Sequence, residues 1–471
     1  MLRKNRDKQT EMELVTYDLL VPKDHLLRKI NTAIDFSFIY KLCAPLYCED
    51  NGRPAIDPEI LFRMLFVGYL YGVRSEVQLV QEIQCNMAYR WFCGLGITEK
   101  VPDHATISIN RQRRFKDNQI AEQVFNEILR QAAGHGLVDG KLLYTDSTHV
   151  KAKANKHKKQ GVTVELQPKA YMEALDAAIA EDRERLGKKP FEKDDNDDDD
   201  PPTKTVQKSP HDPESGQLHK EGKPDGFHYS EHRTVDSKKN IIVNVHVTAA
   251  NVNDVDPLPE ILSQIESRLG YLPGYMGLDA GYHNSIVCKQ LHDKGIQGVI
   301  GYRRHTHKGD HMGKYRFRYD RESNVYICPE KYELHHKTTN RNGYREYYSD
   351  NKRCANCPKR KECFSEKAGR RLITRHVWQD YLDDTTEFTK TSTGRLLYSW
   401  RKETIERSFA DAKVIHGMRN ARMLGITGMQ EQSFLTAAVQ NMKKIAHYCW
   451  KVIRCFSGMT NPLRFSTQGV C

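Results

Sequence analysis

Apolar residues near the start of the chain recur at helical spacing and are separated by short turn signals. Asp57-Pro58 pairs an N-cap residue with a proline at the first helical position, and an apolar stripe follows it. Ser75-Glu-Val-Gln78 has the form of a capping box that opens a second helix. A third helix is expected in the stretch DHATISINRQRRF, which starts at residue 103 and ends in several arginines. We predict an all-helical N-terminal domain over residues 1–125, either a DNA-binding module or a plain helical bundle with a solvated basic face.

From residue 138 the apolar runs become shorter, which is typical of strands. Two of these runs, LLYTD and YMGLD, end in an aspartate, Asp146 and Asp279 respectively. Further strands are expected at 228–236, 241–248 and 298–302, and helices at 257–269 and 286–291. Three strands in sequence, followed by alternating helices and strands, predict a mixed α/β domain. Its first part covers residues 138–304.

Two segments interrupt this α/β pattern. Residues 155–225 contain a lysine-rich start, a helical stretch rich in Ala, Glu and Arg, and an acidic run at 194–200. So polar a run predicts a mobile insertion. Residues 305–395 hold a group of cysteines and an alternating strand at 315–319. Residues 396–455 return to helical spacing and predict two further helices, with residues 456–471 left as a tail.

Charge and hydropathy indicate a protein that does not span a membrane and that binds a polyanion. The chain has 471 residues with 73 Lys plus Arg against 61 Asp plus Glu, a formal net charge of +12, which favours a polyanionic partner. The most apolar run, residues 61–73, is too short to span a membrane and contains Arg63. The N-terminal stretch lacks the apolar segment of a secretion signal, so we expect a cytoplasmic, nucleoid-associated protein.

Three acids stand where a divalent cation could be held against a phosphate. Asp146 and Asp279 end two expected strands, and Glu406 lies on the helix 398–413 among basic residues. Mg²⁺ prefers oxygen ligands and usually takes one or two carboxylates together with phosphate oxygens. Lys402, Glu406 and Lys413 are spaced to share one side of that helix, where Arg401 and Arg407 flank them. The pattern favours a metal-dependent phosphodiester site, although each acid taken singly fits a surface role as well.

The cysteines of the second insertion have metal-ligand spacing. Cys354-x2-Cys357-x5-Cys363 supplies three thiolates, and Cys328 could complete a tetrahedral site for structural Zn²⁺. His335, His336 or His376 could replace Cys328, and free thiols in a loop are the alternative.

Four stretches together resemble the DDE transposases of bacterial insertion sequences. The helical N-terminal part matches through GRPAIDP, starting at Gly52, and DHATIS, starting at Asp103. YTDST around Asp146 and GLDAGY around Asp279 resemble the first two catalytic motifs, and IERSF with Lys413 resembles the motif of Glu406. The family also places a Tyr and an Arg before this Glu. Tyr398 and Arg401 keep their mutual spacing, but Arg401 is one residue farther from the acid than the pattern expects. Either Lys402 takes the place of that Arg, or Glu403 is the acid.

The resemblance implies a ribonuclease-H-like mixed sheet with flanking helices, in which Asp146, Asp279 and Glu406 bind two Mg²⁺ or Mn²⁺ ions. It implies cleavage of double-stranded DNA at the inverted-repeat ends of an element, joining to target DNA, and synapsis by at least a homodimer. The expected phosphate contacts are Lys151, Lys153, Arg401, Lys402, Arg407 and Lys413, and residues 396–455 become the catalytic and packing helices. Lys156, Lys158 and Lys159 extend the lysine run after Asp146. A catalytically inactive DNA-binding regulator and a ribonuclease-H-like nuclease are the alternatives.

Overall fold

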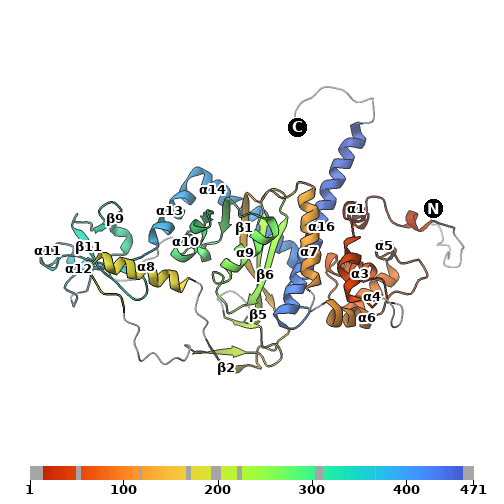
Figure 1. The fold of residues 1–471 in the computed structure, drawn as a ribbon, viewed down its shortest axis with the longest axis horizontal. Helices are drawn as coiled ribbons and strands as arrows, with labels where there is room; N and C mark the ends of the chain where they lie inside the picture. The colour runs from red at the N-terminus through yellow and green to blue at the C-terminus, as the bar shows by residue number, and fades with distance from the viewer. Residues whose placement is uncertain are drawn as a thin grey trace, which may run out of the picture.

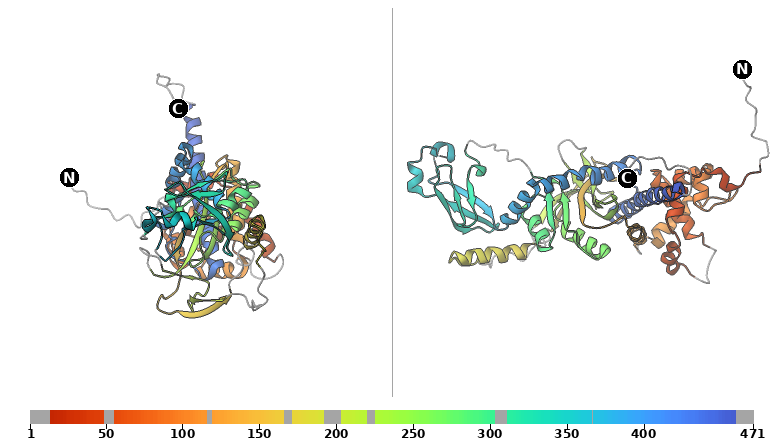
Figure 2. Two further views of the ribbon diagram at one scale, coloured as in Figure 1. Left: turned by 90° about the vertical axis from the view of Figure 1, so that its left-hand side faces the viewer. Right: turned by 90° about the horizontal axis from the view of Figure 1, so that it is seen from above.

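The computed structural model of the chain describes residues 14–48, 55–115, 119–165, 171–191, 203–219, 225–302, 311–365 and 367–459. Three regions follow one another along the long axis: N-terminal helices, a central mixed sheet with its flanking helices, and a small second sheet (Figures 1 and 2). None of the helices in these ranges combines the length and the apolar character that crossing a membrane needs.

The first region is helical, as the apolar spacing predicts, and two helices begin at the expected caps. The Asp57 side chain accepts a hydrogen bond from the Glu59 amide (2.8 Å), and the Ser75 hydroxyl accepts one from the Gln78 amide (3.4 Å). Each bond satisfies an amide that a helix start leaves without an intrahelical partner. The elements are η1 (Tyr17–Leu20), α1 (Leu26–Ala33), α2 (Phe38–Cys43), η2 (Ala44–Leu46), α3 (Pro58–Leu70), α4 (Glu76–Cys85), α5 (Met87–Phe92), α6 (His104–Asn110) and α7 (Ile120–Gly134).

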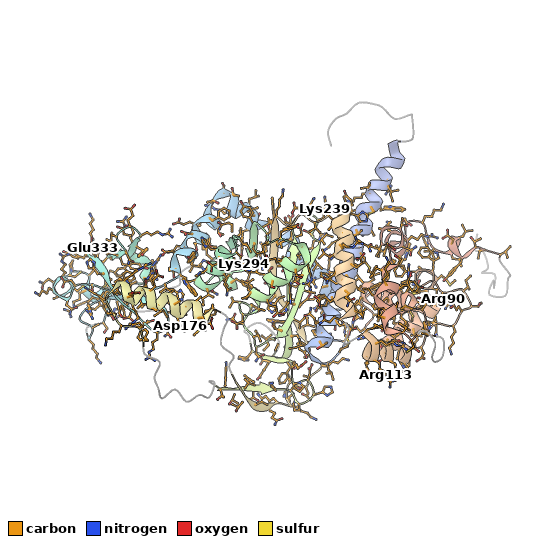
Figure 3. All side chains as sticks on the ribbon, viewed as in Figure 1. Arg90, Arg113, Asp176, Lys239, Lys294 and Glu333 are labelled. Carbon is orange, nitrogen blue, oxygen red and sulfur yellow. The ribbon has the colours of Figure 1, made fainter. Side chains whose placement is uncertain are left out.

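The third helix predicted from the sequence changes its hydrogen-bond pattern partway along. After α6 the chain continues as a π turn, η3 (Arg111–Phe115). A π turn bonds residue i to residue i+5 and is often found at functional sites. The exposed Arg113, labelled in Figure 3, belongs to this turn. The predicted helix is therefore present, and it has the π pattern from residue 111 to residue 115.

The central sheet has the strand order β6–β5–β1–β7–β8, and the short β4 pairs with β5 beside β6. The strands are β1 (Leu142–Lys151), β4 (Gly216–Leu218), β5 (Gly226–Asp236), β6 (Ile242–Ala249), β7 (Tyr275–Leu278) and β8 (Gln297–Ile300). β5 runs antiparallel to both of its neighbours, β1 and β6, whereas β7 and β8 run parallel to β1. This is the order of a ribonuclease-H-like sheet, and the predicted fold class is confirmed.

One long helix, α16 (Gly425–Met459), joins the N-terminal helices to the sheet. It packs against α1, α3 and α7 on one side and β6 on the other. The Asn441 side chain accepts from the Ile242 amide (2.9 Å) and donates to the Ile242 carbonyl (2.8 Å), so it satisfies a strand backbone that would otherwise be buried without partners. The other helices beside the sheet are α9 (Leu258–Leu269), η4 (Ala280–Tyr282), α10 (Ser285–Asp293), α13 (Gln379–Lys390), α14 (Ser392–Ser399), η6 (Lys402–Glu406) and α15 (Arg407–Val414).

The insertion 155–225, predicted as a mobile loop, has regular structure in its described parts. It forms the two-stranded ribbon of β2 (Gln160–Glu165) and β3 (Thr203–Lys208), the helix α8 (Met172–Arg185), and β4. The helix α8 matches the expected helical stretch, whereas the strands were not predicted because three valines are the only strongly apolar residues in β2 and β3. The acidic run 194–200 lies outside the described residues.

The insertion 305–395 carries a five-stranded antiparallel sheet in the order β13–β12–β11–β10–β9. Its elements are η5 (Lys314–Arg316), β9 (Arg318–Asp320), β10 (Val325–Ile327), β11 (Glu333–Thr339), β12 (Tyr344–Tyr348), α11 (Asn351–Ala355), α12 (Arg360–Cys363) and β13 (Leu372–His376). The strand predicted at 315–319 instead begins at Arg318, because a 3-10 turn occupies its first half. α8 is fastened to this sheet by the Arg345–Asp182 ion pair (2.5 Å), which is almost buried.

Candidate active site

The parallel pairing of β1 with β7 places two of the predicted acids side by side. Tyr144 is in register with Gly277, and Asp146 and Asp279 each lie two residues further on. Side chains two residues apart point to the same face, and neighbouring strands lie about 4.8 Å apart. Gly277 is required here, because a Cβ at that position would lie 2.3 Å from the Tyr144 ring. Asp146 is in the middle of β1 rather than at its end, whereas Asp279 follows β7 directly and caps η4.

Glu406, the third predicted acid, is linked to Asp146 by Arg401. Arg401 donates to Glu406 Oε1 (2.9 Å) and also forms an ion pair with Asp146 Oδ2. The guanidinium is mostly buried, with 11% of the side chain exposed, while the Glu406 side chain is 48% exposed. One cation therefore joins Glu406 to Asp146, although Arg401 and Asp146 are 255 positions apart in the chain.

A π turn explains the unexpected spacing between Arg401 and Glu406. The turn η6 spans Lys402–Glu406, and the i to i+5 pattern of such a turn brings residues five apart together. In a regular α-helix the residue four positions before Glu406, Lys402, would face it instead. Lys402 is exposed, and no ion pair is found for it among the described residues. The sequence left open whether Arg401 or Lys402 contacts Glu406, and in the structure the contact is made by Arg401. The backbone carbonyl of Glu403, the alternative acid, accepts a hydrogen bond from Asn240 Nδ2 (3.2 Å).

Burial and neighbouring charges both act on Asp146. Burial raises the pKa of Asp146 to about 6, and the Arg401 guanidinium opposes this rise. The carboxylates of Asp279 and Asp254 add to the rise, so both act on Asp146. The same two acids also help to raise the pKa of the buried Tyr282, after burial itself. Asp254, in the turn after β6, was not predicted from the sequence, because nothing in the spacing of that turn marks it.

Carboxylate oxygens are the ligands that Mg²⁺ prefers, and Asp146 and Glu406 already share one cation, so the donor set fits a divalent metal. As the side chains stand, no three of the described His, Cys, Asp and Glu residues are grouped closely enough to hold a metal ion. Arg401 lies between two of the acids. The residues therefore fit a divalent ion only once this guanidinium has moved.

A buried polar network fixes the helix of Glu406 to the sheet. Arg233 of β5, in register with Asp146, is fully buried and pairs with Glu231 (2.6 Å). It also donates to the Ser408 carbonyl (3.1 Å) and to Gln440 Oε1 (2.7 Å). A buried guanidinium is tolerated only when its donors are satisfied, so this contact sets the position of α15 and α16. The sequence did not predict this network, because polar residues inside an expected strand suggest an exposed face.

The basic residues predicted to contact DNA occupy different environments. Lys413 donates to the Thr148 hydroxyl of β1, and Arg401 is engaged by the acids. Lys151, Lys153, Lys402 and Arg407 are exposed. Lys153 also lines a groove of about 850 Å³ between the N-terminal helices and the central region, together with Arg74, His104, Arg111 and Arg422.

The four predicted cysteine ligands converge at the far end of the molecule. Cys328, Cys354, Cys357 and Cys363 line one small cavity of about 30 Å³. Burial raises the pKa of Cys363 to about 11, and the other three thiols add to this rise. The histidines considered as replacements are engaged elsewhere: His336 with the Thr339 hydroxyl (3.1 Å), His376 with the Trp378 amide (3.2 Å), and His335 beside Glu333 (3.5 Å).

Comparison with known proteins identifies two regions. Residues 15–113 match a family described as "Transposase domain (DUF772)", and residues 327–446 match a family described as "Transposase DDE domain". Glu406 lies inside the second match, whereas Asp146 and Asp279 precede it. No curated protein matches the chain. A solved piggyBac transposase synaptic complex with hairpin DNA matches over 95% of this chain and 87% of its own, but the 9% identity and TM-score of 0.29 are too low to support an argument. The two family matches, one in the helical region and one in the region of the third acid, show that the chain contains two transposase domains, the second of the DDE type.

Proposed function

We propose that this DNA transposase binds the terminal inverted repeats of its own element, cleaves them in a metal-dependent reaction and transfers the strands to target DNA. The observation that carries the proposal is the register of β1 with β7, which sets Asp146 beside Asp279, together with the Arg401 contact that brings Glu406 to Asp146. Three carboxylates from distant parts of the chain are in this way brought to one region of the central sheet.

In this proposal Asp146, Asp279 and Glu406 hold the divalent ions, two Mg²⁺ or Mn²⁺. When bound, such ions supply a nucleophile at neutral pH and stabilise the leaving oxygen of an in-line displacement at phosphorus. The protein fixes the carboxylates: β1 and β7 hold the two aspartates, and the Arg233 network holds the helix that follows Glu406. Before Asp146 and Glu406 can both bind a metal, Arg401 has to leave them, and a DNA phosphate is the acceptor that its guanidinium would then find nearby.

The DNA partner is double-stranded, and synapsis of two ends requires at least a homodimer. The residues 1–125 would read the ends, as a basic helical module can. Lys151, Lys153, Lys402, Arg407 and Lys413 would contact phosphates beside the cleavage point. The sequence-based division of the chain at residues 138–304, 305–395 and 396–455 is part of the same proposal.

The proposal is tested with purified protein, Mg²⁺ and a duplex that carries the terminal repeats flanking its own reading frame. Cleavage at the repeat end, followed by joining to a second duplex, is expected for the wild type. The Asp279→Ala variant should bind the same duplex but not cut it. Cutting that survives this substitution would contradict the catalytic assignment, and cutting without preference for the repeat end would favour a general nuclease.

The four cysteines are proposed to bind a structural Zn²⁺ that stabilises the insertion 305–395. The thiols have to draw together and lose their protons to bind it, which is the usual effect of zinc on thiols. Purified protein should contain one zinc per chain by mass spectrometry. Cys357→Ser should lose it, whereas Cys48→Ser, which changes an exposed thiol outside the cavity, should keep it. Wild-type protein without zinc, or full zinc content in Cys357→Ser, would contradict this assignment.

A further inference from the structure

The ribbon of β2 and β3 is a surface whose purpose the proposed function does not explain. The two strands pair only with each other, from Gln160 opposite Lys208 to Glu165 opposite Thr203. In Figure 1 the ribbon lies below the central sheet, next to the end of that sheet that carries β4. Its three valines join none of the hydrophobic clusters formed by the described residues. A two-stranded sheet without a core is marginally stable in water, which suggests that it is completed by a partner.

One face of the ribbon carries hydroxyl and amide groups. The register places Thr163 opposite Thr205 and Gly161 opposite Gln207 on this face, and all four residues are exposed. A Cβ on Gly161 would lie 3.5 Å from Thr205 Cγ2 and 3.7 Å from Gln207 Nε2, so the two side chains meet over the glycine. A glutamine amide can bond both edge groups of adenine, and a threonine methyl can contact the methyl group of thymine.

The rest of the ribbon is basic. Lys204 and Lys208 lie on the opposite face, beside Val162, Val164 and Val206. Five lysines stand in the nine residues from Lys151 to Lys159, all exposed, and lead from β1 into β2. Together these seven lysines complement the phosphates of a nucleic acid.

The ribbon is also close in the chain to the proposed reaction. β1 carries Asp146, and five residues later Lys151 ends the strand, so the two are about 16 Å apart along it. The backbone of Lys151 is held by the Arg419 carbonyl (3.1 Å) and the Ala421 amide (2.8 Å), which anchors the root of the ribbon. Lys153 lines the groove beside the N-terminal helices, so the segment that leads from β1 into the ribbon passes along this groove.

We propose that the β2–β3 ribbon enters the major groove of the bound duplex, with Thr163, Thr205 and Gln207 toward the base edges and the lysines on the phosphates. The major groove admits a two-stranded β-ribbon, and its base edges differ between all four base pairs. The ribbon would therefore contribute to sequence recognition next to the cleavage point. This inference rests on the proposed function, because it takes the transposon-end duplex as the ligand.

The first test separates base reading from phosphate binding. Affinities of Gln207→Ala and Thr205→Ala are measured for the end duplex and for a scrambled duplex of equal length. A lost base contact costs about 1–3 kcal/mol, so the preference for the end duplex should fall by roughly 5- to 150-fold. Binding to the scrambled duplex and its salt dependence should stay unchanged. Thr374→Ala, which alters an exposed threonine on strand β13, is the matched control and should have no effect.

The second test uses the lysines. Lys204→Gln and Lys208→Gln should weaken binding to both duplexes equally and reduce the slope of log affinity against log salt by about 1 each. Lys337→Gln, an exposed lysine on β11, is the control. Circular dichroism and thermal unfolding verify that every variant is folded.

The outcomes distinguish this inference from the proposed function. If Gln207→Ala and Thr205→Ala keep the preference for the end duplex and the lysine variants keep their salt slopes, the ribbon does not bind DNA. Metal-dependent cleavage is unaffected by that result. A loss of salt slope without a loss of preference overturns base reading and leaves the ribbon as a phosphate clamp, or as a site for another polyanion. If the wild type neither prefers the end duplex nor cuts it, the proposed function itself fails.

Discussion

Arg111 and Arg401 lie in distant regions but make the same kind of contact. Each adjoins a π turn, each has 11% of its side chain exposed, and each bridges two carboxylates from different elements. Arg111 pairs with Glu76 of α4 and with Glu431 of α16 (2.9 Å). Arg401 pairs with Asp146 and Glu406, but the field of Asp279 and Asp254 is added at that position.

The difference lies in the charge around the two bridges. Beside Arg111, the positive charges of Arg422 and Arg74 lie close enough to interact with one another, so the pair of acids is balanced. Beside Arg401, one cation faces several acids, which leaves negative charge for a further cation. The Arg111 bridge therefore holds two helices together. In our proposal, Arg401 pairs with the metal ligands only until the metal binds.

The largest expected effect separates the acids of the two bridges. Glu406→Gln should lower the single-turnover rate of DNA cleavage by at least about 10³-fold, because a lost metal ligand removes several kcal/mol of transition-state stabilisation. Glu431→Gln should leave the cleavage rate of the folded protein nearly unchanged. Glu403→Gln is the second control, and loss of cutting in this variant rather than in Glu406→Gln would identify Glu403 as the third acid.

The next effect is on stability. Arg111→Gln should lower the free energy of unfolding by about 3 kcal/mol, because it leaves Glu76 and Glu431 partly buried without their cation. Urea denaturation measures the change. Arg113→Gln, on the same π turn but exposed, should stay within about 0.5 kcal/mol of the wild type. Equal stability of both variants would show that the Arg111 bridge does not fasten the helices.

The smallest effect tests whether Arg401 competes with the metal. Arg401→Gln should bind Mn²⁺ about tenfold more tightly in the absence of DNA, since the ion no longer has to displace a guanidinium; tenfold corresponds to 1.4 kcal/mol. Calorimetric titration gives the affinity directly. Lys402→Gln is the matched control, because this neighbouring cation makes no contact with Glu406. Unchanged or weaker binding by Arg401→Gln would show that the guanidinium does not occupy the place of the ion.

The elements that the sequence predicted correctly are those with a local signal. Asp57-Pro58 predicted the start of α3, and the runs ending near Asp146 and Asp279 predicted β1 and β7. Elements that depend on distant contacts were missed. The spacing of Arg401 and Glu406 revealed a one-residue mismatch, but only the π turn shows how the mismatch is accommodated. The role of Arg233 was not predicted, because its partners Ser408 and Gln440 are more than 170 positions away.

The ribbon of β2 and β3 was missed for a different reason. Alternating lysine, threonine and valine has the period of a strand, but the polar composition of the whole insertion predicted a loop. Asp254 gave no signal, because an acid in a turn is common and only its neighbours in space single it out.

The packing around α16 has a practical consequence for dissecting this protein. A single apolar core runs from Leu27 and Phe125 of the N-terminal helices through Leu435 and Met442 to Val243 of β6. A fragment starting after residue 125 would expose the apolar side of the 35-residue helix α16 that packs against the N-terminal helices. The region proposed to recognise the transposon end and the region proposed to cleave it thus share one hydrophobic core. A fragment with the catalytic region alone should therefore aggregate rather than cleave DNA.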